Sequence, residues 1–171
     1  MPAQVKPKVT SLLSIQEITK GDEMPIGAWV APPPADVDGI GNPNFITDKY
    51  YQLAKEAGIN ILYGLYENLE RRPEDALAAM NCALRSQLRY LAFSSGIPLK
   101  KSIKEMQTEL TSFCTDHPAY LGVLAYDEPA EAEFDQLEKL ASYYQAVLPD
   151  KLFYANLLPY CAKVTQIKKH K

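Results

Sequence analysis

The feature that most constrains the fold of this chain is a regular alternation of short apolar runs with segments of helical periodicity. Each apolar run has the length of a buried strand, and each intervening segment repeats its apolar residues every three or four positions. Strands are predicted at residues 26–31, 59–64, 90–93, 121–126 and 152–157, and helices are predicted to begin near Thr47, Pro73, Ser102 and Ala130. Repeated strand–helix units imply a parallel sheet with right-handed crossovers. The sequence therefore predicts an α/β fold with five parallel strands and four helices.

Two architectures are compatible with this alternation. One is an open, doubly wound sheet of the flavodoxin type, with helices on both faces and a cleft where the strand order reverses. The other is a (βα) barrel, which needs about 250 residues when complete. This chain has 171 residues, so it would contain about half of such a barrel. On this second interpretation, which we favour, residues 1–23 are an irregular lead-in, residues 24–162 the partial barrel and residues 163–171 a basic tail.

Composition and charge argue against several classes of protein. The net charge is −3 and the basic residues are scattered until the last few positions, which is not the pattern of a nucleic-acid surface. No apolar run approaches the roughly 20 residues that cross a membrane, and residues 11–15 are too short and too polar for the core of a signal peptide. Cys82, Cys114 and Cys161 are widely spaced and odd in number, so we expect buried free thiols rather than a disulfide framework or a zinc site.

The stretch from Tyr120 to Pro129 carries the candidate chemistry. An apolar strand ends there in Asp127 and Glu128, and a helical pattern begins directly after Pro129. Acids at the carboxyl end of a parallel strand lie at the edge of the sheet where α/β folds place their active sites. The alternative is purely structural, because acids and proline are also favoured at the start of a helix by capping and by the helix dipole.

The tetrapeptide at residues 126–129, Tyr-Asp-Glu-Pro, resembles the Asn-Glu-Pro sequence that ends the fourth strand of the TIM-barrel retaining glycoside hydrolases. The resemblance covers residues 25–160, with Gly-Ala-Trp in the first strand and Tyr-Ala-Asn-Leu in the fifth, and it points to bacterial members with Asp-Glu-Pro at this place. It implies a TIM-barrel-like fold, of which this chain holds the N-terminal half, and a general acid/base role for Glu128. Asp127 replaces the family's asparagine, so it can accept a hydrogen bond from the sugar 2-hydroxyl but cannot donate one.

The resemblance also implies that one catalytic group comes from elsewhere. Retaining enzymes need a second carboxylate about 5–5.5 Å from the first, which acts as the nucleophile. The family supplies it from strand seven, whereas only five strands are predicted here, so we expect the isolated chain to be inactive. A nucleophile from Glu67, at the end of the second strand, is the less favoured alternative. Open edges at the first and fifth strands suggest that a second copy, or a missing C-terminal half, completes the barrel.

The expected partner is a carbohydrate. Aromatic rings near strand ends offer flat platforms with a polar edge, although core packing is the alternative for each of them. The candidate substrate-binding residues are Trp29, Tyr66, Glu67, Tyr126, Asp127, Asn156 and Tyr160, with Trp29 the strongest single candidate. A carbohydrate-binding or structural domain without catalysis is the second functional hypothesis, because a fold does not determine a function.

Other chemistries are not expected. His117 and His170 are far apart in the sequence, which argues against a histidine metal site. Residues 39–41, Gly-Ile-Gly, lack the third glycine of a dinucleotide loop, and residues 94–96, Ser-Ser-Gly, are not a nucleophile elbow. We therefore predict no metal and no cofactor. The resemblance favours a secreted or periplasmic location, for which the sequence itself shows no signal peptide.

Overall fold

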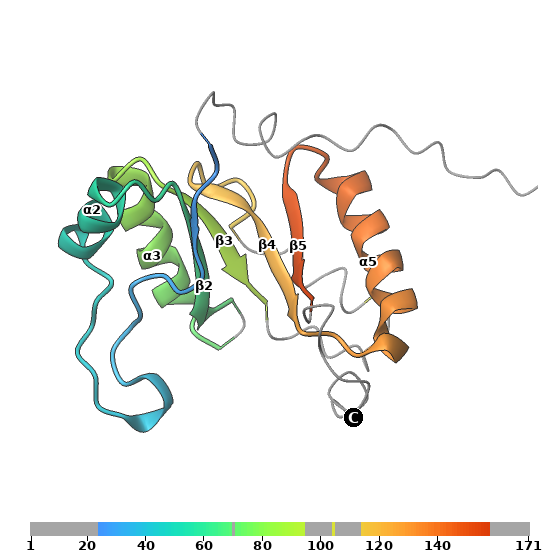
Figure 1. Cartoon of the computed structure of the whole chain (residues 1–171), viewed down its shortest axis with the longest axis horizontal. Coiled ribbons are helices and arrows are strands. Elements are labelled where there is room, and N and C mark those ends of the chain that lie inside the picture. Colours follow the sequence, from blue (N-terminus) through green and yellow to red (C-terminus); the bar gives the residue numbers. More distant parts are fainter. Residues whose placement is uncertain (1–23, 70, 95–103, 105–113, 158–171) are drawn as a thin grey trace, which may run out of the picture.

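The computed structural model describes residues 24–69, 71–94, 104 and 114–157 (Figure 1). They form one five-stranded sheet in which every pair of neighbours is parallel and the strand order follows the chain. The strands are β1 (Gly27–Ala28), β2 (Ile61–Asn68), β3 (Arg89–Phe93), β4 (Tyr120–Asp127) and β5 (Leu152–Asn156). The described helices are α2 (Asp48–Glu56), α3 (Pro73–Arg85) and α5 (Phe134–Val147), with short 3-10 helices η1 (Val37–Gly39) and η2 (Glu131–Glu133). The predicted α/β fold with five parallel strands is confirmed.

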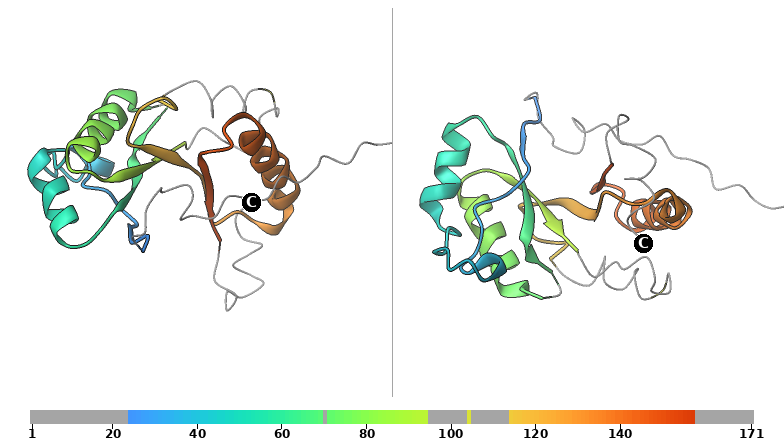
Figure 2. Two further views of the ribbon diagram at one scale, coloured as in Figure 1. Left: turned by 90° about the horizontal axis from the view of Figure 1, so that it is seen from above. Right: turned by 60° about the horizontal axis from the view of Figure 1, so that its bottom comes forward.

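The three described α-helices cover the same face of the sheet. α2 and α3 pack against β2, β3 and the start of β4 through a cluster that contains Tyr51, Met80 and Tyr90. α5 packs against β4 at the other end of the sheet (Figure 2). The hydroxyl of Tyr144 on α5 lies 2.9 Å from that of Tyr120, which belongs to the first cluster. The two helical layers therefore meet on one side of the sheet.

The opposite face of the sheet is strongly concave. Ile61, Leu91 and Leu121 are buried there against Tyr63 of β2 and Tyr154 of β5. The ring centroids of Tyr63 and Tyr154 are 5.2 Å apart, although strands three positions apart are separated by about 14 Å in a flat sheet. The sheet is therefore curled into half a barrel, as Figure 2 shows. The doubly wound alternative is wrong for the described residues, because the strand order never reverses and the helices lie on one face.

The curl depends on a close approach of β5 to β4 at Gly122. A Cβ atom at this position would overlap the carbonyl oxygen of Leu152 and would lie 2.6 Å from the carbonyl carbon and the amide nitrogen of the same residue. The register of β4 also shifts next to Gly122 and again between Leu124 and Tyr126. Such irregularities bend a strand and increase its twist. Glycine and the register shifts together bring the ends of β4 and β5 side by side.

The predicted starts of α2 and α3 are confirmed, whereas α5 begins at Phe134, after the 3-10 turn η2 that follows Ala130. α2 begins after Thr47, and α3 begins at Pro73, which needs no amide hydrogen at the first helical position. Before α5, the Glu133 carboxylate accepts a hydrogen bond of 2.8 Å from the amide of Ala130. This bond satisfies one of the amide groups that a helix start leaves unpaired.

Helical periodicity in the sequence predicts buried stripes along α2 (Tyr50, Leu53, Ala54 and Ala57), along α3 (Leu77, Met80, Leu84 and Leu88) and along α5 (Phe134, Leu137, Leu140, Tyr144 and Leu148). These stripes are wrong in detail. Leu53 of α2 and both Leu77 and Leu84 of α3 are exposed, whereas the buried residues of α3 are Ala76, Ala79, Met80, Cys82 and Ala83. Small side chains allow α3 to lie close to the sheet, so its leucines turn outward. The stripe predicted for α5 is confirmed at Leu137, Leu140 and Tyr144, but Phe134 is exposed.

Two strand boundaries also differ from the prediction. β1 is limited to Gly27–Ala28 because the chain bends at the next two residues, and pairing resumes only at Ala31, whose amide donates to the Tyr63 carbonyl at 2.8 Å. β2 continues beyond Gly64 to Asn68, because a bulge carries residues 65–67 out of register before the strand pairs again with β3.

Several predictions fall outside the described residues. They concern the lead-in (1–23), the basic tail (163–171), the side chains of Cys161 and Tyr160, and the helix expected from Ser102, of which only Lys104 is described. Three α-helices are thus described where four were predicted. Cys82 is a buried free thiol, as expected, and Cys114 is a half-buried one. None of the described helices has the length and apolar character needed to cross a membrane.

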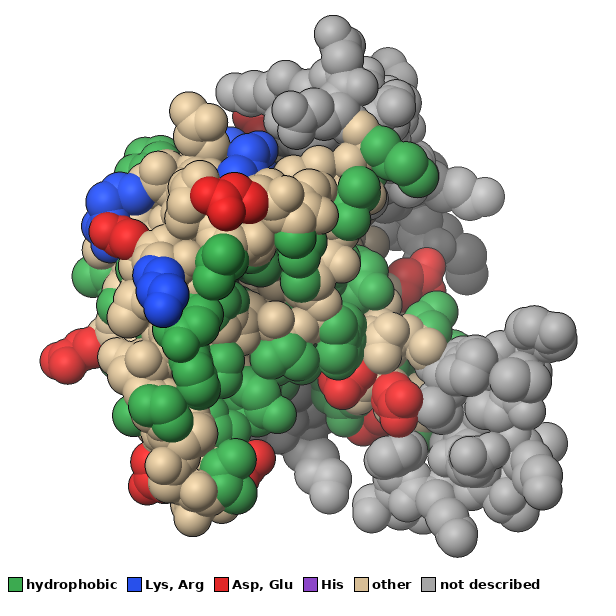
Figure 3. Space-filling view, turned by 60° about the vertical axis from the view of Figure 1, so that its left-hand side comes forward, with side chains coloured by type: hydrophobic (Ala, Val, Ile, Leu, Met, Phe, Trp, Pro, Cys, Tyr) green, Lys and Arg blue, Asp and Glu red, His purple; other side chains and the backbone are tan. Residues whose placement is uncertain are grey.

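The outer side of β1 is an apolar edge. β1 pairs only with β2, and β5 pairs only with β4, within the described residues. Beside β1 lies a pocket of about 350 Å³, whose lining includes Val30, Pro32, Phe45 and Tyr50. Figure 3 turns this side forward and shows hydrophobic side chains gathered on it. An apolar surface next to an unpaired strand is typical of a surface that another segment or chain covers.

Candidate functional site

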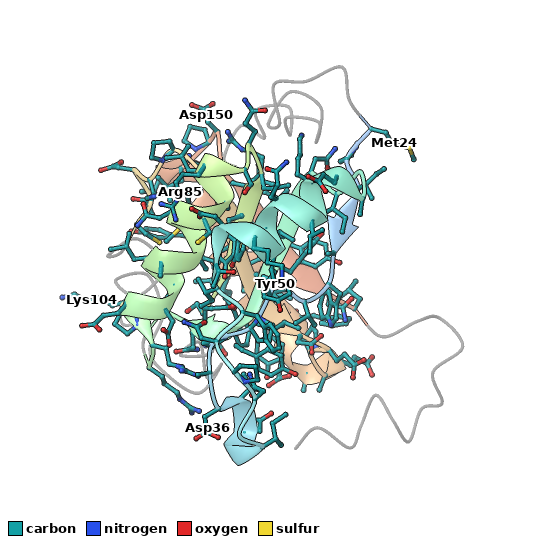
Figure 4. All side chains as sticks on the ribbon, turned by 90° about the vertical axis from the view of Figure 1, so that its left-hand side faces the viewer. Met24, Asp36, Tyr50, Arg85, Lys104 and Asp150 are labelled. Atoms are coloured by element: carbon teal, nitrogen blue, oxygen red, sulfur yellow. The ribbon has the colours of Figure 1, made fainter. Side chains whose placement is uncertain are left out.

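The candidate site lies at the end of the sheet where the parallel strands terminate. Figure 4 shows Met24, which precedes β1, and Asp36, in the loop after β1, at opposite ends of the molecule. Asp127 and Asn156 are the last residues of β4 and β5, and they are partners in the strand register. Because all strands run in one direction, their carboxyl ends share one rim. We call the group of Asp127, Glu128 and Asn156 the β4–β5 rim.

Hydrogen bonds hold the β4–β5 rim together. The side-chain amide of Asn156 donates to Oδ1 of Asp127 at 2.8 Å. The backbone amide of Glu128 donates to the carbonyl oxygen of Asn156 at 2.7 Å. Asp127 is exposed and Glu128 is half-buried. Three of the residues predicted for the site are therefore neighbours at the surface of one rim.

Glu128 adopts an unusual backbone conformation. Its φ is +53°, in the left-handed region, which costs a residue with a side chain about 1–2 kcal/mol. The chain turns sharply here, because β4 ends at Asp127 and η2 begins at Glu131. The bond from the Glu128 amide to Asn156 stabilises this turn. Strained residues are concentrated at functional sites, so the conformation adds weight to Glu128 as a candidate.

An aromatic row crosses the concave face toward the rim. Trp29, directly after β1, is 39 % exposed, and its ring centroid lies 5.6 Å from that of Tyr63. Tyr63 in turn contacts Tyr154 in a T-shaped arrangement. Burial and the neighbouring Tyr154 raise the pKa of Tyr63 above its ordinary value. Tyr154 lies two residues before Asn156 on β5, so the two side chains project from the same face of the strand.

Tyr126 lies apart from the aromatic row. Its hydroxyl donates to Oε1 of Glu133 at 3.0 Å, and its ring packs with the cluster beneath α5. Burial and this hydrogen bond raise the pKa of Tyr126 to about 12. The side chain therefore joins the end of β4 to the start of α5 and is engaged on the helical face of the sheet.

Tyr66 lies at the carboxyl end of β2 and is 38 % exposed. It lines a pocket of about 300 Å³ together with Asn68, Phe93, Asp38 and Arg71, among others. The pocket thus combines two aromatic rings, an amide and charges of both signs. It adjoins the ends of β2 and β3, and no motif in the sequence indicates Arg71 or Asp38 as candidate residues.

Glu67 lies on the opposite side of β2 from this pocket. Its side chain has no exposed surface, and it faces Tyr51 of α2 and Tyr90 of β3. Burial raises the pKa of the Glu67 carboxyl to about 7. A ligand would reach this carboxyl only after the layer between the sheet and the helices had opened. Tyr160, the remaining candidate, lies outside the described residues.

Tyr63 and Tyr154 belong to the site but were not among the candidate residues predicted from the sequence. Both lie within strands, where an aromatic residue ordinarily indicates core packing. Tyr63 lies two residues after Ile61, and Tyr154 lies two residues after Leu152. This spacing is the only sequence signal that both tyrosines point to the concave face of the sheet. Without the strand register and the curl, that signal does not reveal that the rings meet.

The arrangement can bind hydroxyl groups and transfer protons. Two carboxylates and an amide at the β4–β5 rim supply hydrogen-bond acceptors, one donor and a candidate general acid/base. The aromatic row supplies a flat apolar surface. Among the described residues, no cluster of three or more His, Cys, Asp or Glu side chains could hold a metal ion.

Comparison with protein-family models, with curated proteins and with solved structures found no match to this chain.

Proposed function

We propose that this chain provides the acid/base half of a glycoside hydrolase active site, with Glu128 as the general acid/base. The observation that carries the proposal is the placement of Asp127 and Glu128 at the carboxyl end of the fourth strand of a curled parallel half-barrel. This is the place where barrels of strand–helix units carry catalytic residues. The resemblance of residues 126–129 to the Asn-Glu-Pro type of TIM barrel supports the same role.

In the proposed reaction, Glu128 donates a proton to the glycosidic oxygen and later removes one from water. Asp127 and Asn156 bind hydroxyl groups of the same sugar, in an orientation set by the hydrogen bond between them. A neighbouring sugar stacks on Trp29, the most exposed end of the aromatic row. The nucleophile comes from a second copy or from further strands that complete the barrel.

Completion of the barrel is part of the proposal. The apolar surface beside β1 and the lack of a second partner for β1 and β5 among the described residues support a covering partner, because exposed parallel edges invite pairing. Size-exclusion chromatography with light scattering distinguishes the two arrangements. A dimer supports pairing between copies. A stable, well-folded monomer would contradict pairing between copies. The proposal would then require that the additional strands come from a longer protein.

The catalytic test replaces Glu128 by Gln in the assembly that completes the barrel, because the isolated chain is expected to be inactive. Glycosides with a poor alkyl leaving group should lose about 10²–10⁴ of their turnover, because they need protonation. Nitrophenyl glycosides should lose less in the cleavage step, because their leaving group departs without a proton. Glu131→Gln, at an exposed acid of η2, is the matched control and should leave both rates unchanged. Equal turnover of Glu128→Gln and the wild type on alkyl glycosides would remove Glu128 from the mechanism.

The second candidate function is carbohydrate binding without catalysis. It is favoured by the aromatic row, which needs no second carboxylate to act as a sugar platform. Isothermal titration calorimetry against a panel of oligosaccharides tests it, with Trp29→Ala as the disabled variant and Trp29→Phe as the conservative one. Binding that Trp29→Ala loses and Trp29→Phe retains, with no hydrolysis by any assembly of the wild type, would favour this function over catalysis.

A further inference from the structure

Glu67 is an unusual buried group. It is 0 % exposed, and neither of its carboxylate oxygens has a hydrogen bond of acceptable geometry within the described residues. The hydroxyls of Tyr51 and Tyr90, which face it, are also buried, and neither makes a hydrogen bond of acceptable geometry with another described residue. Buried polar groups are nearly always hydrogen-bonded. The Glu67 carboxyl and the two tyrosine hydroxyls lie together without good hydrogen bonds, so this arrangement needs a physical explanation.

The described strands and helices bring these three groups together, and none of the described residues places a cation among them. Tyr90 of β3 lies across Gly64 of β2, where a Cβ atom would overlap its hydroxyl, so the ring reaches the bulge that contains Glu67. Tyr51 comes from α2, on the helical side of the sheet. Burial opposes the ionised form of Glu67 most strongly, and the backbone amides of Glu67 and Tyr66 and the Tyr90 hydroxyl, which lie near the carboxyl, favour that form to a smaller extent, so the pKa is raised. A neutral carboxyl is the form that fits this site.

Among the residues that the structure describes, the other titratable groups around the site do not supply a positive charge to Glu67. Asp75 of α3 acts on the carboxyl and opposes its ionisation. Asp75 itself pairs with Arg72, with 2.6 Å between Nε and Oδ2. Cys82 of α3 faces Tyr51, and Cys114, before β4, faces Tyr90. An ionised Glu67 would therefore be a buried charge with no counter-ion from the described part of the chain, and a buried unpaired charge is among the costliest arrangements in a protein.

The position of Glu67 links this site to the rim. Residues 65–67 form the bulge of β2, and the residues on either side of Glu67, Tyr66 and Asn68, line the pocket of about 300 Å³ at the carboxyl end of the strand. We propose that Glu67 is a proton-controlled latch: in its neutral form it holds the end of β2 against α2 and α3, and in its ionised form it releases this end and rearranges the pocket. The proposal does not depend on what the pocket binds.

The direction of the effect follows from the two states of the carboxyl. Below pH 4.5, the ordinary value for glutamate, Glu67 is neutral whether β2 is closed or released, so pH has no effect. Between pH 4.5 and about 7, only the released form loses its proton, so rising pH favours release. Above about pH 7 both forms are ionised and the effect is complete. The equilibrium constant for release rises about tenfold per pH unit in this window, and about 300-fold in total.

Hydrogen exchange read by mass spectrometry tests the latch. The peptide covering residues 61–69 is followed from pH 5 to pH 8, after correction for the intrinsic dependence of exchange on pH. In the wild type, the protection of this peptide should fall by at least about tenfold across the range. Glu67→Gln keeps the shape of the side chain without its ionisation and should give a flat profile. Glu74→Gln, at an exposed acid of α3, is the matched control and should behave as the wild type.

The pH profile of Glu67→Gln distinguishes the latch from its absence. A profile of Glu67→Gln that follows the wild type would overturn it. If Glu67→Gln fails to fold, carbon-13 NMR of the glutamate carboxyls of the wild type takes its place. One glutamate with a midpoint near 7 supports the latch, and midpoints below about 5.5 for every glutamate would overturn it. Neither measurement uses a sugar, so failure here is distinct from failure of the proposed function.

Discussion

Replacement of Gly122 by alanine tests the close approach of β4 and β5 most directly. The new Cβ atom would lie 2.6 Å from the carbonyl carbon and the amide nitrogen of Leu152, whereas ordinary contact begins at 3.4 Å. β5 would therefore have to move by at least 0.8 Å, the difference between these distances. The obstacle is backbone, which cannot rotate out of the way as a side chain can.

The size of the effect combines two opposing contributions. Inserting a methyl group into a tightly packed interior destabilises a protein by about 1–3 kcal/mol, and a backbone obstacle places Gly122→Ala near the upper limit. Restricting the unfolded chain by replacing glycine recovers about 0.4–1 kcal/mol. We expect a net loss of about 2 kcal/mol in the free energy of unfolding, which lowers the melting temperature of a chain of this size by about 4–8 °C.

Urea denaturation followed by far-ultraviolet circular dichroism measures this loss. Gly27→Ala is the matched control, because its Cβ atom would meet only the ring edge of Tyr63, also at 2.6 Å, and a side chain can shift. The control should lose less than about 1 kcal/mol. A Gly122→Ala variant as stable as the wild type, or a control that loses more, would refute the argument that backbone contact at Gly122 sets the fit of β5 on β4.

Two further predictions concern the helical layer and the rim. Tyr120→Phe and Tyr144→Phe should each destabilise the protein by about 1–3 kcal/mol, because each leaves a buried hydroxyl unpaired, and the double variant should lose less than the sum of the two. Chemical denaturation of the four proteins checks this, and strictly additive losses would contradict the hydrogen bond. Asp127→Ala should change the free energy of unfolding by less than about 0.5 kcal/mol, because the residue is exposed, but should weaken oligosaccharide binding in calorimetry about tenfold through the lost hydroxyl contact. Undiminished binding would exclude Asp127 from sugar recognition.

The strand positions and the order of the elements could be predicted because their signals are local. Apolar runs ended by proline, glycine or acids locate a strand without any knowledge of its neighbours. The proximity of Asp127 and Asn156 also follows from the sequence, because parallel strands end at a common rim and these residues end adjacent strands. The adjacency at the rim needs only the direction and the order of the strands.

The side chains that depend on irregular backbone could not be predicted. The bulge in β2 places Glu67 on the helical side, whereas the sequence analysis expected it at the rim. The contact between Tyr63 and Tyr154 depends on the curl of the sheet, which no local pattern encodes. The faces of α3 were misassigned because leucine is more hydrophobic than alanine, while the close packing of helix on sheet selects the smaller residue.

The left-handed backbone of Glu128 places two demands on a single position. The turn out of β4 would be satisfied most easily by glycine, which has no proton to give, and a carboxylate is tolerated there only at an energetic disadvantage. Random drift should therefore tend to replace this glutamate, unless its chemistry is under selection. At this position, the residue that would stabilise the fold most differs from the residue that the reaction needs. Folding and activity therefore make opposite demands on a single amino acid.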